Sequence, residues 1–245
     1  MDGTELAIVL AAVVLGSVVK AVTGMGLPII AIPVAATFVD LETAVVVLAL
    51  PNALANGVLA LGEREHLRET RDLPVLAVTG VVGAIVGAVA FVRLPPEPLV
   101  AVLVSSIVIY VVAFFVAPDL RTGPERSRRL APAVGFVAGA FQGAIGISGP
   151  IVGSWIHSYR LPRGAHILSV TTLFLLSGTT QLVVLTADGR LAGRLGATLL
   201  ACIPVLASIP VGRRLRDRVS TRGFDLAVVA MLLVSVVALV ARQVG

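Results

Sequence analysis

The stretch KAVTGMGLP, Lys20 to Pro28, decides how this chain has to fold. It places the only lysine of the chain, two glycines and a proline near the middle of an apolar run that covers residues 5–39. As one straight helix this run would be about 52 Å long, whereas the hydrocarbon core of a bilayer is about 30 Å thick. We therefore expect an interruption at the Gly and Pro cluster, either as a strongly broken span or as a re-entrant hairpin.

The composition of the whole chain is that of an integral membrane protein. Hydrophobic residues make up 57% and charged residues 13%, with a mean hydropathy of +1.01, whereas soluble domains carry about 25% charged residues. Apolar runs long enough to cross a bilayer recur. They predict six full spans in an all-α protein, at residues 41–61, 73–92, 99–116, 164–186, 195–211 and 224–240.

The charges indicate membrane topology rather than nucleic-acid binding. The net charge is +5, but the arginines lie in short loops between apolar runs, as expected for orientation signals. The N-terminal MDGTEL has neither a positive flank nor a cleavage site, so we expect no cleaved signal. Cys202 is the only cysteine, which excludes a disulfide framework and a cysteine metal cluster. We expect no cofactor and no metal.

An internal repeat relates the two halves of the chain. A shift of 122 residues lays KAVTGMGLPIIA over QGAIGISGPIVG, so that Lys20 matches Gln142 and Pro28 matches Pro150. The alternative is chance similarity in a chain rich in Gly, Ala and Val. The alignment predicts a first membrane repeat at residues 1–116, a cytoplasmic linker at 117–130 and a second membrane repeat at 131–245.

Loop charges favour re-entrant hairpins at the two long elements, residues 5–39 and 131–161. If both elements crossed the membrane, Lys and Arg would divide 10 to 8 between the two sides. If both are re-entrant, they divide 14 to 4, as the positive-inside rule requires. The second count places both termini outside and inverts the second repeat relative to the first, because each repeat then has three full spans.

The two breaks are the predicted binding site. Interrupted helices leave amides and carbonyls unpaired, at a cost of several kcal/mol each in lipid, so breaks persist where a ligand, water or protein satisfies them. Matching breaks in two repeats point to the substrate site of a transporter. Pro28 and Pro150 stand where the returning half-helices begin, and free amides at a helix N-terminus attract anions.

Lys20 adds a positive charge to the first break. A lysine at mid-membrane costs at least about 2.5 kcal/mol, so we interpret it as the counter-charge of a bound anion. The alternative is a lysine that snorkels to the lipid surface. Gln142, at the matching position, would supply a neutral hydrogen bond.

Other polar residues extend the candidate site. Asn52 and Asn56 share one helix face, although asparagines also join helices. Thr171 and Thr172 match Ala49 and Leu50 in the repeat, near the level of Asn52. No Asp or Glu lies deep in an apolar run, which argues against a carboxylate proton relay. The candidate substrate-binding residues are Lys20, Thr23, Gly24, Met25, Gly26, Asn52, Asn56, Gln142, Gly146, Ile147, Ser148, Gly149, Thr171 and Thr172.

Two other classes of function explain the sequence less well. Ser148 with His157 or His166 suggests an intramembrane serine protease, which needs a base within reach of the hydroxyl. His157 would lie about 13 Å from Ser148 along a helix, so we expect no enzyme. A membrane scaffold accounts for the hydrophobicity but not for two matched breaks.

The segments GSVVKAVTGMGLPIIAIP (residues 16–33) and GFVAGAFQGAIGISGPIVGSW (residues 135–155) resemble the TauE/SafE family of sulfite exporters, also called TSUP. The resemblance covers essentially the whole chain. It implies transport of small sulfur-containing or organic anions, such as sulfite or sulfoacetate, across the plasma membrane. By motif match, residues 24–28 and 146–150 would line the path. This chain departs from the usual pattern at GMGLP, where a run of glycines is common, and at Lys20.

We therefore expect a secondary permease that works by alternating access around a midplane site formed by two broken helices. The alternatives are a broad organic-anion permease and a non-transporting membrane scaffold. The expected partners are a small anionic substrate and membrane lipid, without nucleic acid. A homodimer is compatible with the sequence, although the spacing of Gly80, Gly83 and Gly87 favours close packing within the monomer.

Overall fold

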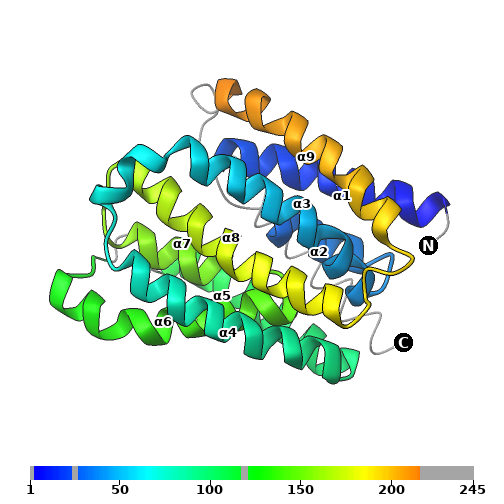
Figure 1. Cartoon of the computed structure of the whole chain (residues 1–245), viewed down its shortest axis with the longest axis horizontal. Coiled ribbons are helices and arrows are strands. Elements are labelled where there is room, and N and C mark those ends of the chain that lie inside the picture. Colours follow the sequence, from blue (N-terminus) through cyan, green and yellow to red (C-terminus); the bar gives the residue numbers. More distant parts are fainter. Residues whose placement is uncertain (1–2, 24–26, 117–120, 216–245) are drawn as a thin grey trace. The chain divides into compact units, whose positions relative to one another are not determined.

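The computed structural model describes residues 3–23, 27–116 and 121–215, and every regular element in these ranges is helical (Figure 1). This confirms the all-α prediction for the described part of the chain. The elements are α1 (Gly3–Thr23), α2 (Leu27–Ala36), α3 (Leu41–Gly62), the 3₁₀ helix η1 (Arg64–Glu69), α4 (Leu73–Arg93), α5 (Pro96–Val116), α6 (Pro124–Ile145), α7 (Gly149–His157), α8 (Arg163–Ala187) and α9 (Leu195–Leu215).

Four of the described helices are long and apolar enough to cross a membrane, namely α1, α3, α4 and α8. The last three coincide with predicted spans. The predicted spans at residues 99–116 and 195–211 lie in α5 and α9, where the described apolar windows are shorter. The sixth, residues 224–240, lies outside the described residues. The chain is therefore embedded in a membrane, while its number of crossings stays a prediction.

The chain divides into two compact units. Unit 1 consists of Met1–Asn52 with Arg190–Gly245, and unit 2 consists of Ala53–Gly189. In unit 1, α1 packs against α2 and α9, and in unit 2, α4 packs against α6 and α8. These units do not coincide with the two predicted repeats, which were inferred from the sequence and stay a prediction. Within the predicted linker, residues 124–130 form the first turns of α6, which begins at Pro124; the boundaries of the repeats and the linker stay predictions.

Both long elements are interrupted where the sequence predicted, and in each the chain folds back on itself. In unit 1, a Cβ placed on Gly16 of α1 would lie 2.7 Å from the Leu27 carbonyl oxygen and 3.2 Å from the Ala31 Cβ. In unit 2, Val152 and Trp155 of α7 line a narrow cavity together with Gly135 of α6. The short helices α2 and α7 therefore return along α1 and α6.

Each break lies near the middle of its predicted apolar run, but the two helical arms are unequal in length. The first arm has 21 residues in α1 and 22 in α6, and the returning arm has only 10 in α2 and 9 in α7. At 1.5 Å per residue the long arms measure about 31 to 33 Å and the short arms about 14 to 15 Å. The long arms extend further because helical residues precede the apolar runs, as in the charged start of α6. Re-entry into the membrane stays a prediction.

A stripe of small residues holds α4 against α6 in unit 2. A Cβ on Gly83 would overlap the Phe136 carbonyl, and one on Gly139 would overlap the Gly80 carbonyl. Glycine is required here because the two backbones touch, which is how small residues bring membrane helices together. The predicted use of this spacing within the monomer is confirmed.

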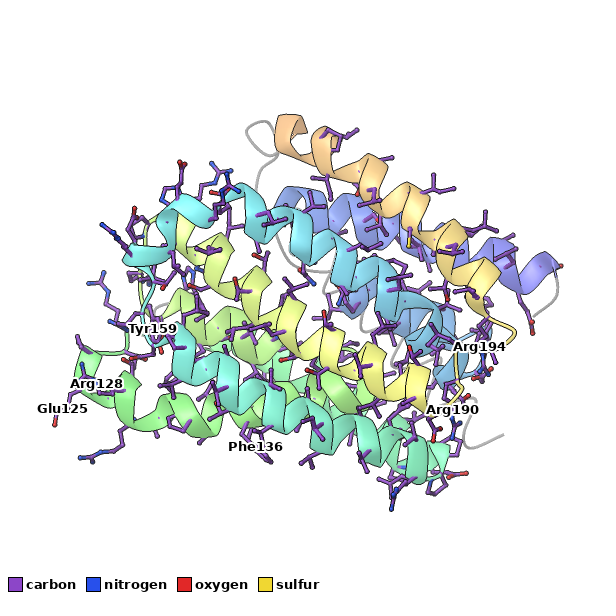
Figure 2. The ribbon with its side chains drawn as sticks, viewed as in Figure 1. Glu125, Arg128, Phe136, Tyr159, Arg190 and Arg194 are labelled. Carbon is purple, nitrogen blue, oxygen red and sulfur yellow. The ribbon has the colours of Figure 1, made fainter. Side chains whose placement is uncertain are left out.

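A polar cluster fixes the end of the short arm α7. Tyr159 follows α7 and accepts a hydrogen bond from Trp155 Nε1 at 2.6 Å. Burial raises the pKa of Tyr159 to about 12, so its hydroxyl stays protonated and donates to Asp72 Oδ2 at 3.1 Å. The Arg71 guanidinium stacks on the ring, 3.8 Å from its centroid. Figure 2 shows Tyr159 at this end of unit 2. The cluster ties α7 to the connection between η1 and α4.

A second polar cluster lies in unit 1 at the start of α3. Glu42 accepts from Arg190 Nη1 at 2.6 Å and from Arg194 Nη1 at 3.1 Å, and both arginines lie in the connection that leads into α9 (Figure 2). The Asp40 carboxylate accepts from the amide and the hydroxyl of Thr43, both at 2.7 Å, and so caps α3. These contacts attach α9 to the beginning of α3.

Candidate functional site

The part of the candidate site in unit 1 is centred on Lys20. Its side chain is 3% exposed in the last turn of α1, and Nζ lies 3.5 Å from Oδ1 of Asn52, which is 4% exposed. Partial negative charge on the last carbonyls of a helix stabilises a cation there. The lysine is thus turned inward to a polar neighbour, and it does not snorkel to the surface of the structure.

The rest of the first break is only partly described. Asn56 lies one turn after Asn52 in α3 and is fully buried, but it belongs to unit 2. Thr23 is the last residue of α1, and Gly24, Met25 and Gly26 lie outside the described residues. Their predicted role at the tip therefore stays a prediction.

Ser17 belongs to the same polar group, although it is absent from the predicted site. Its side chain is 1% exposed, and its Oγ has no hydrogen-bond partner among the described residues. It precedes Lys20 by three residues and therefore shares its helix face. Only this spacing could have found it, because a serine in an apolar helix ordinarily bonds to its own backbone.

The second break, in unit 2, is held by the side chain of Gln142. Its Nε2 donates to the Gly146 carbonyl at 3.0 Å, and its Oε1 accepts from Ser148 Oγ at 2.9 Å. Gly146 ends α6 with φ +72°, a left-handed conformation that favours glycine, and its amide donates to the Gln142 carbonyl at 2.8 Å. A primary amide carries two protons, so Gln142 can staple the break and still offer a donor to a ligand.

Three backbone amides lie at this break, at residues 147–149. Ile147 and Ser148 are buried and Gly149 is half-buried, and none of their three amides donates to an acceptor among the described residues. The Ser148 hydroxyl does not cap α7, because it is engaged with Gln142. Pro150 occupies the first turn of α7, as predicted. The start of α7 is therefore an array of free donors with the positive end of a helix behind it.

The space beside the second break is small. A cavity lined by Gly135, Gly139, Ser148, Trp155 and Ser177, among others, has a volume of about 10 Å³, enough for about one water molecule. An anion with several heavy atoms needs more room than this. This cavity is therefore too small to hold such an anion.

The predicted threonine pair does not present two free hydroxyls. Thr171 is fully buried, and its Oγ1 donates to the Ile167 carbonyl at 2.7 Å, so its proton is engaged within α8. Thr172 is half-buried. Gln181, one of the polar residues of the same span, donates to the Gly143 carbonyl of α6 at 3.0 Å, which is the interhelical bond expected of a membrane amide.

In unit 2, the serine and the histidines that suggested a protease have other partners. The Ser148 hydroxyl donates to Gln142, and His157 packs its ring edge against His166 with centroids 6.3 Å apart. Nor do the described residues contain a group of three His, Cys, Asp or Glu side chains that could hold a metal ion.

Comparison with known proteins identifies a family. The family model described as sulfite exporter TauE/SafE matches residues 8–239, which is nearly the whole chain. No curated protein and no solved structure shows a significant match.

Proposed function

Because the chain belongs to the TauE/SafE family of sulfite exporters, we propose that it is a secondary transporter for a small oxyanion, with sulfite or a related sulfonate as substrate. The family is one of membrane permeases and not of enzymes, and the apolar helices embed this chain in a membrane. The choice of substrate, the residues that bind it and the transport cycle are the parts that we propose.

The observation that carries the proposal is the burial of Lys20 in an apolar helix directly before a chain break. A buried ammonium is costly in a membrane protein, so ionisable residues there mark substrate pathways. Lys20 lies against the neutral amide of Asn52, which can orient an ammonium but does not neutralise its charge. A bound anion would interact favourably with the positive charge of this buried ammonium.

The free amides at the second break favour the same class of ligand. Amides at the start of a helix bind anions without carrying a full charge, and three of them stand at residues 147–149. Each unit thus has its own group that attracts anions: the charge of Lys20 in unit 1 and the oriented dipoles of residues 147–149 in unit 2. A cation would be repelled by both groups.

The small volume of the cavity beside the second break favours a carrier over an open channel. Since there is room for about one water, each transport cycle has to open and close the site. Alternating access by movement of one repeat against the other is the expected mechanism for an inverted repeat.

Purified protein in liposomes tests the proposal. Initial rates are measured for sulfite, sulfoacetate, sulfate, a monocarboxylate and chloride, with protein-free liposomes as the control. Saturable sulfite or sulfonate flux that exceeds the other rates supports the proposal. Equal rates for all organic anions identify a broad permease, and the absence of any flux above the control identifies a scaffold; either result refutes it.

A further inference from the structure

We propose that the Ser17 hydroxyl is a direct ligand of the transported oxyanion, which it binds together with Lys20 and Asn52. This inference rests on the proposed transport function and adds a specific donor to the site. It is argued from the state of one hydroxyl, from its position on α1 and from the chemistry of its neighbours.

The Ser17 hydroxyl is buried without a hydrogen bond among the described residues. Burial of a hydroxyl without a partner is unfavourable, and nearly all buried polar side chains in native proteins have one. An alanine at this position would avoid the problem and would suit a helix better. The hydroxyl therefore has a partner in some functional state, and a substrate is one that this structure does not contain.

Other buried hydroxyls in these helices donate hydrogen bonds to carbonyls of their own helix. Ser106 donates to the Leu103 carbonyl at 2.7 Å, Ser169 donates to the Ala165 carbonyl at 2.7 Å, and Thr171 donates to its preceding turn in the same way. Such bonds to the preceding turn are the usual state of a helical serine or threonine. Ser17 lies in a helix of 21 residues and could make the same bond, but its hydroxyl makes no hydrogen bond to a described residue.

The position of Ser17 brings it to the positive groups of the first break. Ser17 and Lys20 lie on one face of α1, and Val13 continues this buried face toward the N-terminus. The adjacent Gly16 packs on the Leu27 carbonyl, so this level of α1 lies beside the first turn of α2. The amides at the start of α2, a helix of 10 residues, add positive potential to that of the ammonium.

The corresponding position in the second half is unable to supply a hydroxyl. The shift of 122 residues places Ser17 on Gly139, where a Cβ would overlap the Gly80 carbonyl. The second half therefore offers backbone amides and Gln142, and the first half offers Ser17 with Lys20. We assign the side-chain recognition of the substrate to the first half.

The three side chains define a class of ligand. A hydroxyl, an ammonium and a primary amide are all hydrogen-bond donors, and they suit an anion that presents several oxygen atoms. Sulfite and the sulfonate group each present three. A halide accepts hydrogen bonds without separate oxygen atoms, so loss of one oriented donor should affect it less.

The test compares Ser17→Ala with Ser169→Ala, a matched deletion of a buried hydroxyl that already has a partner. Thermal melting without anion, sulfite affinity by calorimetry and liposome KM are measured for both variants and the wild type. For Ser17→Ala we expect an unchanged or higher Tm and a sulfite Kd that rises about ten- to a hundredfold, the usual effect of a lost bond to a charged group. For Ser169→Ala we expect a lower Tm and an unchanged Kd.

A wild-type Kd in Ser17→Ala overturns the inference, and so does a fall in Tm as large as that of Ser169→Ala, since the hydroxyl would then have a structural partner. Failure of Ser17→Ala to fold overturns it for the same reason. If the wild type transports sulfite and Ser17→Ala is indistinguishable from it, the inference fails and the proposed function stands. If the wild type neither binds nor transports any anion of the panel, both fail.

Discussion

Replacement of Lys20 by methionine separates the role of its charge from the role of its bulk. Methionine has a similar length and no charge, so it can fill the same space at 3% exposure. A pair of unit charges about 4 Å apart at an effective dielectric constant of about 20 interacts by about 4 kcal/mol. Since each 1.4 kcal/mol is tenfold in affinity, and desolvation of the ammonium offsets part of the gain, we expect Lys20→Met to weaken sulfite binding by about 10²- to 10³-fold.

The same substitution should not harm the fold. A lysine at the centre of a membrane helix costs about 2.5 to 3.5 kcal/mol on insertion scales, and methionine removes that cost. Folded yield and Tm in detergent should therefore equal or exceed those of the wild type. If Lys20→Met weakens sulfite binding but folds at least as stably as the wild type, the lysine is retained for function and not for stability.

The assay measures sulfite flux into liposomes and sulfite Kd for the wild type, for Lys20→Met, and for Arg64→Met as a matched removal of an exposed positive charge in η1. Arg64→Met should keep the wild-type values. Wild-type rates and Kd in Lys20→Met, at equal protein levels, would refute the role of Lys20 as counter-charge. A large loss of folded protein in Lys20→Met would refute the reasoning that its burial is costly.

Three further predictions concern packing, pH and topology. Gly139→Ala should lower the free energy of unfolding by about 1 to 3 kcal/mol or more, and Tm with it, because the added Cβ meets the Gly80 backbone. Gly196→Ala, with open space around the glycine, should be neutral or stabilising. Equal Tm values for the two variants would contradict this prediction. A hydrogen bond from His66 Nδ1 to Glu69, together with the charges of Glu69, Glu65 and Glu63, raises the pKa of His66 above 6.5, so its stabilising effect should be complete below about pH 6.5 and disappear as pH rises through the folded pKa. The Tm difference between wild type and His66→Gln, scanned from about pH 5 to 9, should shrink toward alkaline pH; a constant difference would exclude this linkage. Single cysteines in the 62–72 and 213–222 loops, in a Cys202→Ala background, should both resist an impermeant thiol reagent added to intact cells, and labelling of one loop alone would disprove the predicted topology.

Much of the fold follows from local rules that act along the sequence. Apolar runs of bilayer length require helices, because helices satisfy their own backbone in lipid. A glycine and proline cluster interrupts a helix through backbone conformation and a missing amide, which located both breaks and placed Pro28 and Pro150 in the returning arms. The stripe at Gly80 and Gly83 was also recognisable from the sequence, because glycines at helical spacing are typical of a helix face that packs closely against another backbone.

The sequence did not determine how the polar groups around those breaks are used. Ser17, Thr171 and Ser169 are all hydroxyls in apolar helices, and only the structure shows that the last two bond to their own turn whereas Ser17 does not. Gln142 was predicted to offer a hydrogen bond, yet its part in closing the break with Ser148 and Gly146 depends on the geometry of the turn.

The unequal arms show which properties the sequence determines and which ones only the tertiary structure decides. Composition and spacing along the sequence determined that this chain is helical, enters a membrane and breaks twice, because these properties depend on each segment and on lipid alone. Tertiary structure decided how far each arm extends, which backbones touch and which buried donors remain free. Those outcomes depend on contacts between residues far apart in the chain. The identity of a residue does not show whether its hydroxyl or amide has a hydrogen-bond partner in the folded protein.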